Sequence, residues 1–196
     1  DVGQGDSIVI ELPQRKGVYV IDTGGLLRFE EEKWQKKKRP FDIGRSIVST
    51  YLKGRGIAAI DALVITHADS DHMEGAFGLL EEIKVREIHY SKGSEEKEVM
   101  EKLLQRAAER KVSIYSAHRS NKWQVGDVSF RYVYPERDAP YEDNDSSLVL
   151  VVETPFREVW LTGDLEHEGE RKLMSLEKKR PLKPVLLKVG HHGSRT

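Results

Sequence analysis

The sequence contains no cysteine among its 196 residues. Disulfide-bonded scaffolds and metal sites built on thiolates are therefore excluded. The compartment stays open, because a chain without cysteine suits either side of a membrane. The sequence also lacks any run of about 18 apolar residues, so none of it is expected to span a bilayer. No signal peptide is recognisable either.

Net charge is also nearly absent, since 32 basic and 33 acidic residues leave a formal charge of −1. Composition alone therefore does not indicate a nucleic-acid-binding protein. Hydrophobic residues make up only 38% of the chain and charged residues 33%, which predicts a strongly ionic surface around a core that can still fold. One basic run is either a solvated loop or a surface for nucleic-acid backbones; it consists of Lys36, Lys37, Lys38 and Arg39.

The length suits one domain, or one fold made of two similar halves. The sequence opens at Asp1 inside what resembles a motif, and it stops two residues after Ser194, directly after another. We therefore expect residues 1–196 to form a single domain that has been excised from a larger protein.

Apolar patterning predicts strands and helices in alternation. Strands are expected at residues 7–12, 17–22, 62–66, 85–90, 112–115, 128–134, 147–152, 159–162 and 185–189. Helices are expected at residues 45–52, 73–83, 95–110 and 166–176. The first two strands read as a hairpin. Because hairpins occur beside the alternating pattern, we expect an α/β fold with a mixed sheet covered by helices.

Four potential metal ligands fall within six residues, at His67, Asp69, Asp71 and His72. They follow a predicted buried strand and precede a predicted helix. The turn can aim His67 and Asp69 into one metal site, while Asp71 and His72 can reach a second. We expect Asp71 and His72 to point outward and pack little. Polar capping of the turn is the alternative, but it explains one of the four residues. A helix N-terminus also suits a phosphate.

Two further polar groups directly follow predicted apolar strands. Asp164 follows one of them, and His191, His192 and Ser194 follow the last strand of the sequence. An acid or a histidine pair at the end of a buried strand is suited to a crevice at strand ends. Together with the first cluster, these residues predict a metal site there.

In combination, these motifs resemble the metallo-β-lactamase superfamily. The resemblance rests on THADSDH at residues 66–72, TGD at 162–164 and HHGS at 191–194. Two more motifs, DVGQGDS at residues 1–7 and NDSSL at 144–148, narrow it further. They are similar to the hydrolase domain at the C-terminal end of the ComEC family of competence proteins, which are channels for DNA uptake. The resemblance covers nearly the whole chain.

The resemblance implies an αββα sandwich with two divalent metal ions held between its sheets. Carried over by position, the metal ligands would be His67, Asp69, Asp71, His72, Asp164 and His191. Asp164 would bridge the two ions. Asp6 and Asp22 would support the ligands from behind.

Roles in catalysis and substrate binding follow from the chemistry of the expected reaction and, for residues 36–39, from the basic run. The catalytic residues would be Asp71, Asp164 and His192. The substrate-binding residues would be Asn144, Ser194, Lys36, Lys37, Lys38 and Arg39. His89, His118 and His167 are expected to be surface or packing residues.

The sequence departs from the superfamily pattern at Asp69, where a histidine is usual. It departs again near Asn144, where another histidine ligand commonly precedes the bridging aspartate. A C-terminal part of the usual domain is also absent from residues 1–196. Three aspartates, three histidines and no cysteine favour Mn²⁺, although Zn²⁺ also accepts such a set. The site of His67 and Asp69 is expected to be the weaker one.

The resemblance implies a metal-dependent phosphodiesterase. The leading interpretation is a DNase that binds the DNA backbone and degrades the strand that is not transported during uptake. It would be a soluble domain tethered to the plasma membrane by the rest of a channel protein, on the extracytoplasmic side. One alternative is a phosphorylcholine or other cell-wall phosphodiesterase on the same fold. The other is a degenerate metal-site domain that only binds DNA or a partner protein. A β-lactamase is less favoured, because the ligands are rich in carboxylates.

Overall fold

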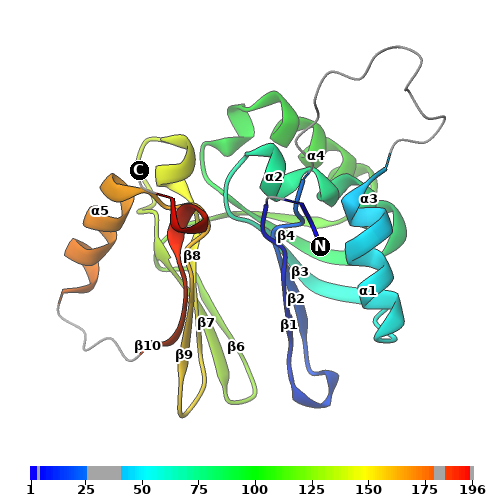
Figure 1. Cartoon of the computed structure of the whole chain (residues 1–196), viewed down its shortest axis with the longest axis horizontal. Coiled ribbons are helices and arrows are strands. Elements are labelled where there is room, and N and C mark those ends of the chain that lie inside the picture. The colour runs from blue at the N-terminus through cyan, green and yellow to red at the C-terminus, as the bar shows by residue number, and fades with distance from the viewer. Residues whose placement is uncertain (4, 26–40, 179–183, 195–196) are drawn as a thin grey trace.

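The computed structural model describes residues 1–3, 5–25, 41–178 and 184–194. The basic run at residues 36–39 lies outside these ranges. Within them the strands form two five-stranded sheets that stand face to face. Helices α1, α3 and α4 cover the outer face of one sheet, and α5 covers the outer face of the other (Figure 1). This is the αββα sandwich expected from the sequence.

The first sheet has the strand order β1-β2-β3-β4-β5. Its strands are β1 Ile8–Glu11, β2 Val18–Ile21, β3 Ala59–Ile65, β4 Lys84–Ser91 and β5 Ser113–Ala117. Strands β1 and β2 form the predicted antiparallel hairpin, and the remaining neighbours pair in parallel. The helices on this side are α1 Ser49–Gly54, α2 Ser70–Met73, α3 Gly75–Glu82 and α4 Glu98–Glu109.

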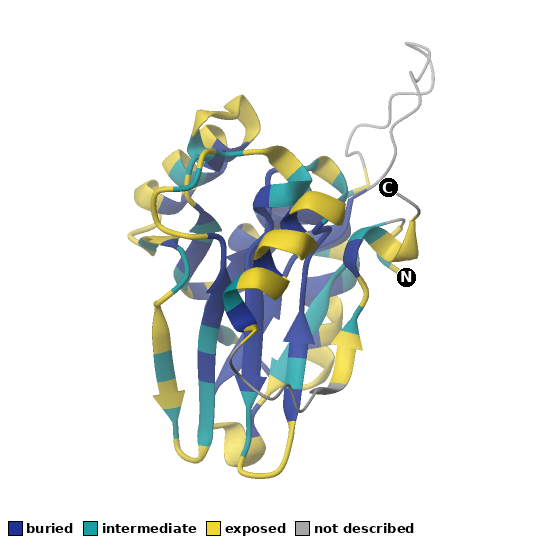
Figure 2. Ribbon diagram, turned by 90° about the vertical axis from the view of Figure 1, so that its left-hand side faces the viewer, coloured by how far each residue is buried: buried dark blue, intermediate teal, exposed yellow. Residues whose placement is uncertain are grey.

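The second sheet has the strand order β10-β9-β8-β7-β6. Its strands are β6 Lys122–Val125, β7 Val128–Tyr134, β8 Val149–Glu153, β9 Glu158–Leu161 and β10 Pro184–Lys188. Strands β6 to β9 pair antiparallel, and β10 runs parallel to β9. Helix α5, His167–Glu177, packs on the outer face. Figure 2 shows its exposed surface in front of strands that are mostly buried.

Apolar side chains of successive strand residues point to opposite faces of the sheet and so form separate layers of the core. Val20 and Leu63 face the helices of the first sheet, whereas Ile21 and Val64 face the second sheet. Successive strand residues point to opposite faces, so an almost unbroken apolar run serves both layers. The carboxyl ends of β2 and β3 therefore emerge side by side at one edge of the sandwich, supported by apolar packing on both faces.

Strand β6 was missed by the sequence-based prediction. Its four residues alternate between exposed and half-buried positions, so the strand lacks a strong apolar signal. The signal that could have found it is the Gly126-Asp127 turn into β7, where Gly126 has a φ of +60°. Two-residue turns of this kind join antiparallel strands and favour glycine.

Candidate metal centre

The side chains that could bind metal gather where strands of both sheets end. Asp22 directly follows β2, His67 follows β3, Asp164 follows β9 and His192 follows β10. Asp6 precedes β1, which pairs antiparallel with β2 and so begins at the same edge. Segments far apart in the sequence thus supply one site between the two sheets.

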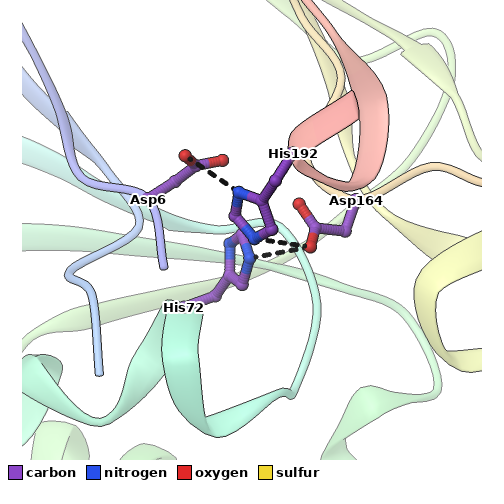
Figure 3. A group of neighbouring side chains, drawn as sticks. All are labelled: Asp6, His72, Asp164 and His192. Carbon is purple, nitrogen blue, oxygen red and sulfur yellow. Dashed lines mark ion pairs between the residues drawn. The ribbon is translucent and has the colours of Figure 1, made fainter. Parts of the chain in front are cut away.

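Four of these side chains form a tight group, shown in Figure 3. Asp6, His72, Asp164 and His192 each offer one ligand atom, and these atoms lie within 4.8 Å of one another. Both His72 Nε2 and His192 Nε2 lie 3.1 Å from Asp164 Oδ2. His192 Nδ1 lies 3.6 Å from Asp6 Oδ1. Two carboxylates and two imidazoles converging in this way suit a divalent transition metal.

Asp22 fixes the orientation of the ligand-bearing turn. Its Oδ1 accepts a hydrogen bond from the Thr66 backbone N–H at 2.8 Å. Its Oδ2 lies 2.8 Å from His72 Nδ1 and also accepts the Thr66 hydroxyl at 2.7 Å. Because an ionised carboxylate only accepts, His72 must donate from Nδ1. Nε2 is then the imidazole atom that is left for a metal.

The same network sets the tautomer of His67. The Thr66 hydroxyl gives its single proton to Asp22, and Thr66 Oγ1 lies 3.0 Å from His67 Nδ1. His67 therefore donates from Nδ1, and its Nε2 carries a lone pair. That Nε2 is buried and has no hydrogen-bond partner within the described ranges. A buried polar atom left unpaired costs about 1–3 kcal/mol, so this nitrogen fits a metal ion that would satisfy it.

The pKa values of His67 and His72 are shifted in opposite directions. Burial, aided by the nearby His72, lowers the pKa of His67 to about 3. Burial alone would also lower the pKa of His72, but Asp22 and the bond to Asp164 raise it to about 10. Burial would raise the pKa of Asp164, yet His72 and Lys188 hold it well below its usual range. His67 is thus a neutral ligand at pH 7, whereas His72 keeps a proton that a metal would displace.

The remaining aspartates of the first motif lie at the rim of this group. Asp71 Oδ2 is 3.7 Å from His192 Nε2 and 4.0 Å from His72 Nε2. Asp69 Oδ2 is 3.8 Å from His67 Nε2. Partial burial and the neighbouring Asp71 raise the pKa of Asp69. These distances are compatible with the predicted division into two adjoining sites.

The two neighbouring histidines point to different partners. His192 belongs to the tight group, whereas His191 Nδ1 lies 3.0 Å from Glu166 Oε1. Asn144 Nδ2 donates to the same Glu166 oxygen at 3.0 Å. Sequence reasoning named His191 as a ligand and His192 as catalytic, and it did not single out Glu166, two residues beyond Asp164. Ser194 is exposed at the end of the same turn.

The expectation that His72 packs little is wrong. Its side chain is fully buried, because α2 begins at Ser70 and turns His72 inward beneath Asp164. Asp71, one residue earlier, is 29% exposed. As expected, His89 is a buried packing residue, and His118 and His167 lie nearer the surface.

Two glycines let the chain pass directly against the backbone of the ligand helix. A Cβ on Gly5 would lie 1.4 Å from the carbonyl oxygen of Asp71, and one on Gly25 would lie 2.0 Å from that of Ser70. Any other residue would push α2 away. Gly5 of DVGQGDS therefore lets the chain approach α2 closely enough to bring the adjacent Asp6 next to the histidines.

Comparisons with known proteins agree with this geometry. A family model described as the metallo-beta-lactamase superfamily matches residues 1–196. ComE operon protein 3 of Bacillus subtilis is 42% identical over 195 residues, which cover 100% of this chain and 25% of that protein. Competence protein ComA of Neisseria gonorrhoeae is 28% identical, and the match covers 100% of this chain and 23% of that protein. The chain spans about a quarter of the length of these relatives.

Solved structures show the same fold at low sequence identity. A metallo-β-lactamase of Cronobacter sakazakii with a HARLDQ motif has a TM-score of 0.57 and 14% identity, over 89% of this chain and 63% of that one. The subclass B3 metallo-β-lactamase MEM-A1 from a soil metagenome has a TM-score of 0.55 and 10% identity, over 94% and 72%. Topology, site geometry and the full-length family match together show that the chain belongs to the metallo-β-lactamase superfamily.

Proposed function

We propose that this chain is a divalent-metal-dependent phosphodiesterase that hydrolyses DNA during its uptake. Members of the superfamily are generally metal-dependent hydrolases, and the fold binds divalent metals. The observation that carries the hydrolase assignment is the tight group of Asp6, His72, Asp164 and His192. The choice of DNA rests on the names of relatives that match this whole chain, ComE operon protein 3 and competence protein ComA.

The candidate metal ligands among the described residues fall into two sets, one for each ion. His72 and Asp71 would hold one ion, while His67 and Asp69 would hold the other. Asp164 would stand between them. The unpaired Nε2 of buried His67 and the convergence on Asp164 Oδ2 are the features that fit metal binding. The oxygen-rich ligand set favours Mn²⁺, with Zn²⁺ as the second choice.

His191 stays a predicted metal ligand, in an arrangement that involves Glu166. His191 Nδ1 lies 3.0 Å from Glu166 Oε1, an ion pair without hydrogen-bond geometry, so Nε2 is the atom that we expect to face a metal. A carboxylate behind a histidine ligand commonly fixes its ring and raises its basicity. Asn144 would then hold Glu166 through the bond it donates, while its own Oδ1 is buried without a hydrogen-bond partner among the described residues.

The reaction is the attack of water on phosphorus, with cleavage of one P–O ester bond and protonation of the leaving oxygen. Divalent ions, when bound, supply Lewis acidity that acidifies water and neutralises phosphate charge. Asp71 is the carboxylate placed to take up the proton, because it is partly exposed beside both histidines. His192, one-third exposed, can donate to the developing charge on the phosphate or the leaving oxygen. Asp22 holds the imidazole ring of His72 in a fixed orientation, and through Thr66 it does the same for His67.

We further propose that residues 1–196 are one domain of a larger membrane-bound protein that acts on the extracytoplasmic side. The relatives are about four times as long as this chain. Strand β10 lies at the edge of its sheet and exposes Leu186 and Leu187 at 59% and 54%. Such an apolar edge calls for a covering segment. Among the described residues, no helix is long and apolar enough to cross a membrane.

A substrate panel tests the proposed function and separates it from its alternatives. Purified, metal-stripped protein is incubated with plasmid, single-stranded DNA, a chromogenic phosphodiester and a phosphorylcholine diester, with Mn²⁺ or Zn²⁺ added. Asp164→Asn serves as the inactive control. We expect both DNAs to be cut only by the metal-loaded wild type. Turnover of the phosphorylcholine diester without DNA cleavage would favour the cell-wall enzyme, and DNA binding without any hydrolysis would favour the degenerate domain.

A further inference from the structure

Lys188 is a buried cation that the proposed reaction does not use. It is the last residue of β10, and its side chain is only 16% exposed. Its Nζ lies 3.0 Å from Asp164 Oδ1 and 2.5 Å from Asp6 Oδ2, and it donates to the Gly163 carbonyl oxygen. Three oxygens from two separate segments therefore surround the ammonium group.

The three oxygens around the Lys188 ammonium group resemble the ligands of a metal cation more than the usual hydrogen-bond partners of a lysine. Carboxylate and carbonyl oxygens are the ligands that hard cations prefer. The contact with Asp6 is an ion pair without hydrogen-bond geometry, so charge rather than direction holds it. Gly163 has a φ of +55°, and a Cβ there would lie 2.9 Å from Thr66 and from Ser147. That conformation, which favours glycine, fixes the third oxygen in place.

The two carboxylate oxygens of Asp164 have different partners, because the Lys188 ammonium group contacts only one of them. Oδ1 faces Lys188, while Oδ2 faces both His72 Nε2 and His192 Nε2. Lys188 neutralises one oxygen and leaves the other for the histidines. It also joins Asp164 to Asp6, two carboxylates that would otherwise repel each other across the gap between the sheets.

We propose that Lys188 is a positioning residue whose ammonium group occupies an all-oxygen cation pocket beside the metal centre. It acts through Asp164, whose free oxygen it aims at the histidines. The inference rests on the proposed metal centre, which it deepens. It implies that the Asp6–Asp164–Gly163 pocket binds a hard divalent cation once the ammonium group is removed. A lysine that pairs with a single exposed carboxylate, as Lys102 does with Glu98, has no such consequence.

The test compares thermal unfolding of wild type and Lys188→Met in metal-free buffer and in a Ca²⁺ titration. Methionine keeps most of the aliphatic stem and removes the charge. We expect Lys188→Met to unfold at a lower temperature without ions, and saturating Ca²⁺ to raise its midpoint by about 5 °C more than that of wild type. Lys102→Met is the matched control, since Lys102 pairs with Glu98 on the exposed face of α4. Its Ca²⁺ response should equal that of wild type.

A double variant tests whether the extra Ca²⁺ response arises in this pocket. Asp6→Asn combined with Lys188→Met removes one pocket carboxylate together with the ammonium group, so it should fold without ions and lose the extra Ca²⁺ response. If Lys188→Met alone does not fold, its refolding is measured with and without Ca²⁺, and only the Ca²⁺ sample should recover. Equal Ca²⁺ responses in wild type and Lys188→Met, or refolding that ignores Ca²⁺, would overturn the inference. Because this readout needs no catalysis, a failure of DNA hydrolysis would count against the proposed function alone.

Discussion

Asp22 Oδ2 lies 2.8 Å from His72 Nδ1, in a contact where the two residues are 1% and 0% exposed. The contact joins the end of β2 to the first turn of α2. It sets the imidazole so that Nε2 faces Asp164 Oδ2 at 3.1 Å. The position of the proposed metal centre depends on this one orientation.

Asp22→Asn should weaken metal binding without altering any proposed ligand. The amide is neutral, and its nitrogen can donate where the carboxylate oxygen accepts, so it stops fixing the tautomers of His72 and His67. Removing such supporting partners typically costs about 10- to 100-fold in metal affinity. Titration calorimetry with Mn²⁺ measures the loss. Asp127→Asn, in the exposed turn before β7, is the matched control, and an equal affinity for both variants would refute this role for Asp22.

His72→Ala and Asp71→Ala should both abolish hydrolysis but differ in stability. His72 is buried against two carboxylates, so its removal leaves buried charge uncompensated and should cost about 3 kcal/mol. Asp71 is partly exposed, and its loss should cost less than about 1 kcal/mol. Urea denaturation of the metal-free variants measures both values. Similar stabilities for the two variants would contradict the buried position of His72.

Metal binding should release about one proton, which comes from His72. The pKa of His72 is raised from 6.5 to about 10, whereas that of His67 is lowered to about 3. A raised histidine pKa stabilises the metal-free fold fully below pH 6.5, and this contribution is lost as the pH rises toward about 10. Apparent Mn²⁺ affinity should therefore increase about tenfold per unit between pH 7 and 9. Calorimetry in buffers of different ionisation enthalpy counts the protons, and an affinity independent of pH would contradict this state of His72.

Charge reversal at Lys36, Lys37, Lys38 and Arg39 should weaken DNA binding while leaving turnover of a small diester intact. These residues lie outside the described ranges, and their role rests on the basic run in the sequence. Each lost phosphate contact should lower the slope of affinity against salt by about one. Binding to labelled DNA across a salt titration checks this. Lys102→Glu on the exposed face of α4 is the control, and the same slope in both proteins would assign the run to a solvated loop.

Much of the fold and part of the site could be predicted because their signals are local. THADSDH combines a strand end, a tight turn and a helix start in seven residues, so its place at a strand-end crevice follows from its own pattern. Strand β6 could not be found in this way, because Lys122–Val125 has no continuous apolar face and gains its place only by pairing with β7.

The details of the centre depend on geometry that the pattern does not contain. His191 and His192 both have left-handed backbone angles, with φ of 41° and 52°, which direct two adjacent rings to different partners. The sequence could not say which of them joins Asp164. Lys188 at a strand end is compatible with a solvated surface lysine, and its contacts with Asp164 and with Asp6 from the other sheet make it part of the site.

The central claim is that DNA is hydrolysed at the metal centre around Asp164. The most direct measurement titrates metal-stripped protein with Mn²⁺ and follows bound Mn²⁺ by electron paramagnetic resonance and cleavage of labelled DNA in the same samples. Cleavage should rise in step with bound Mn²⁺, exceed that obtained with Zn²⁺, and be absent in Asp164→Asn. DNA cleavage that persists in a chelator, or that Asp164→Asn retains at the wild-type rate, would contradict it.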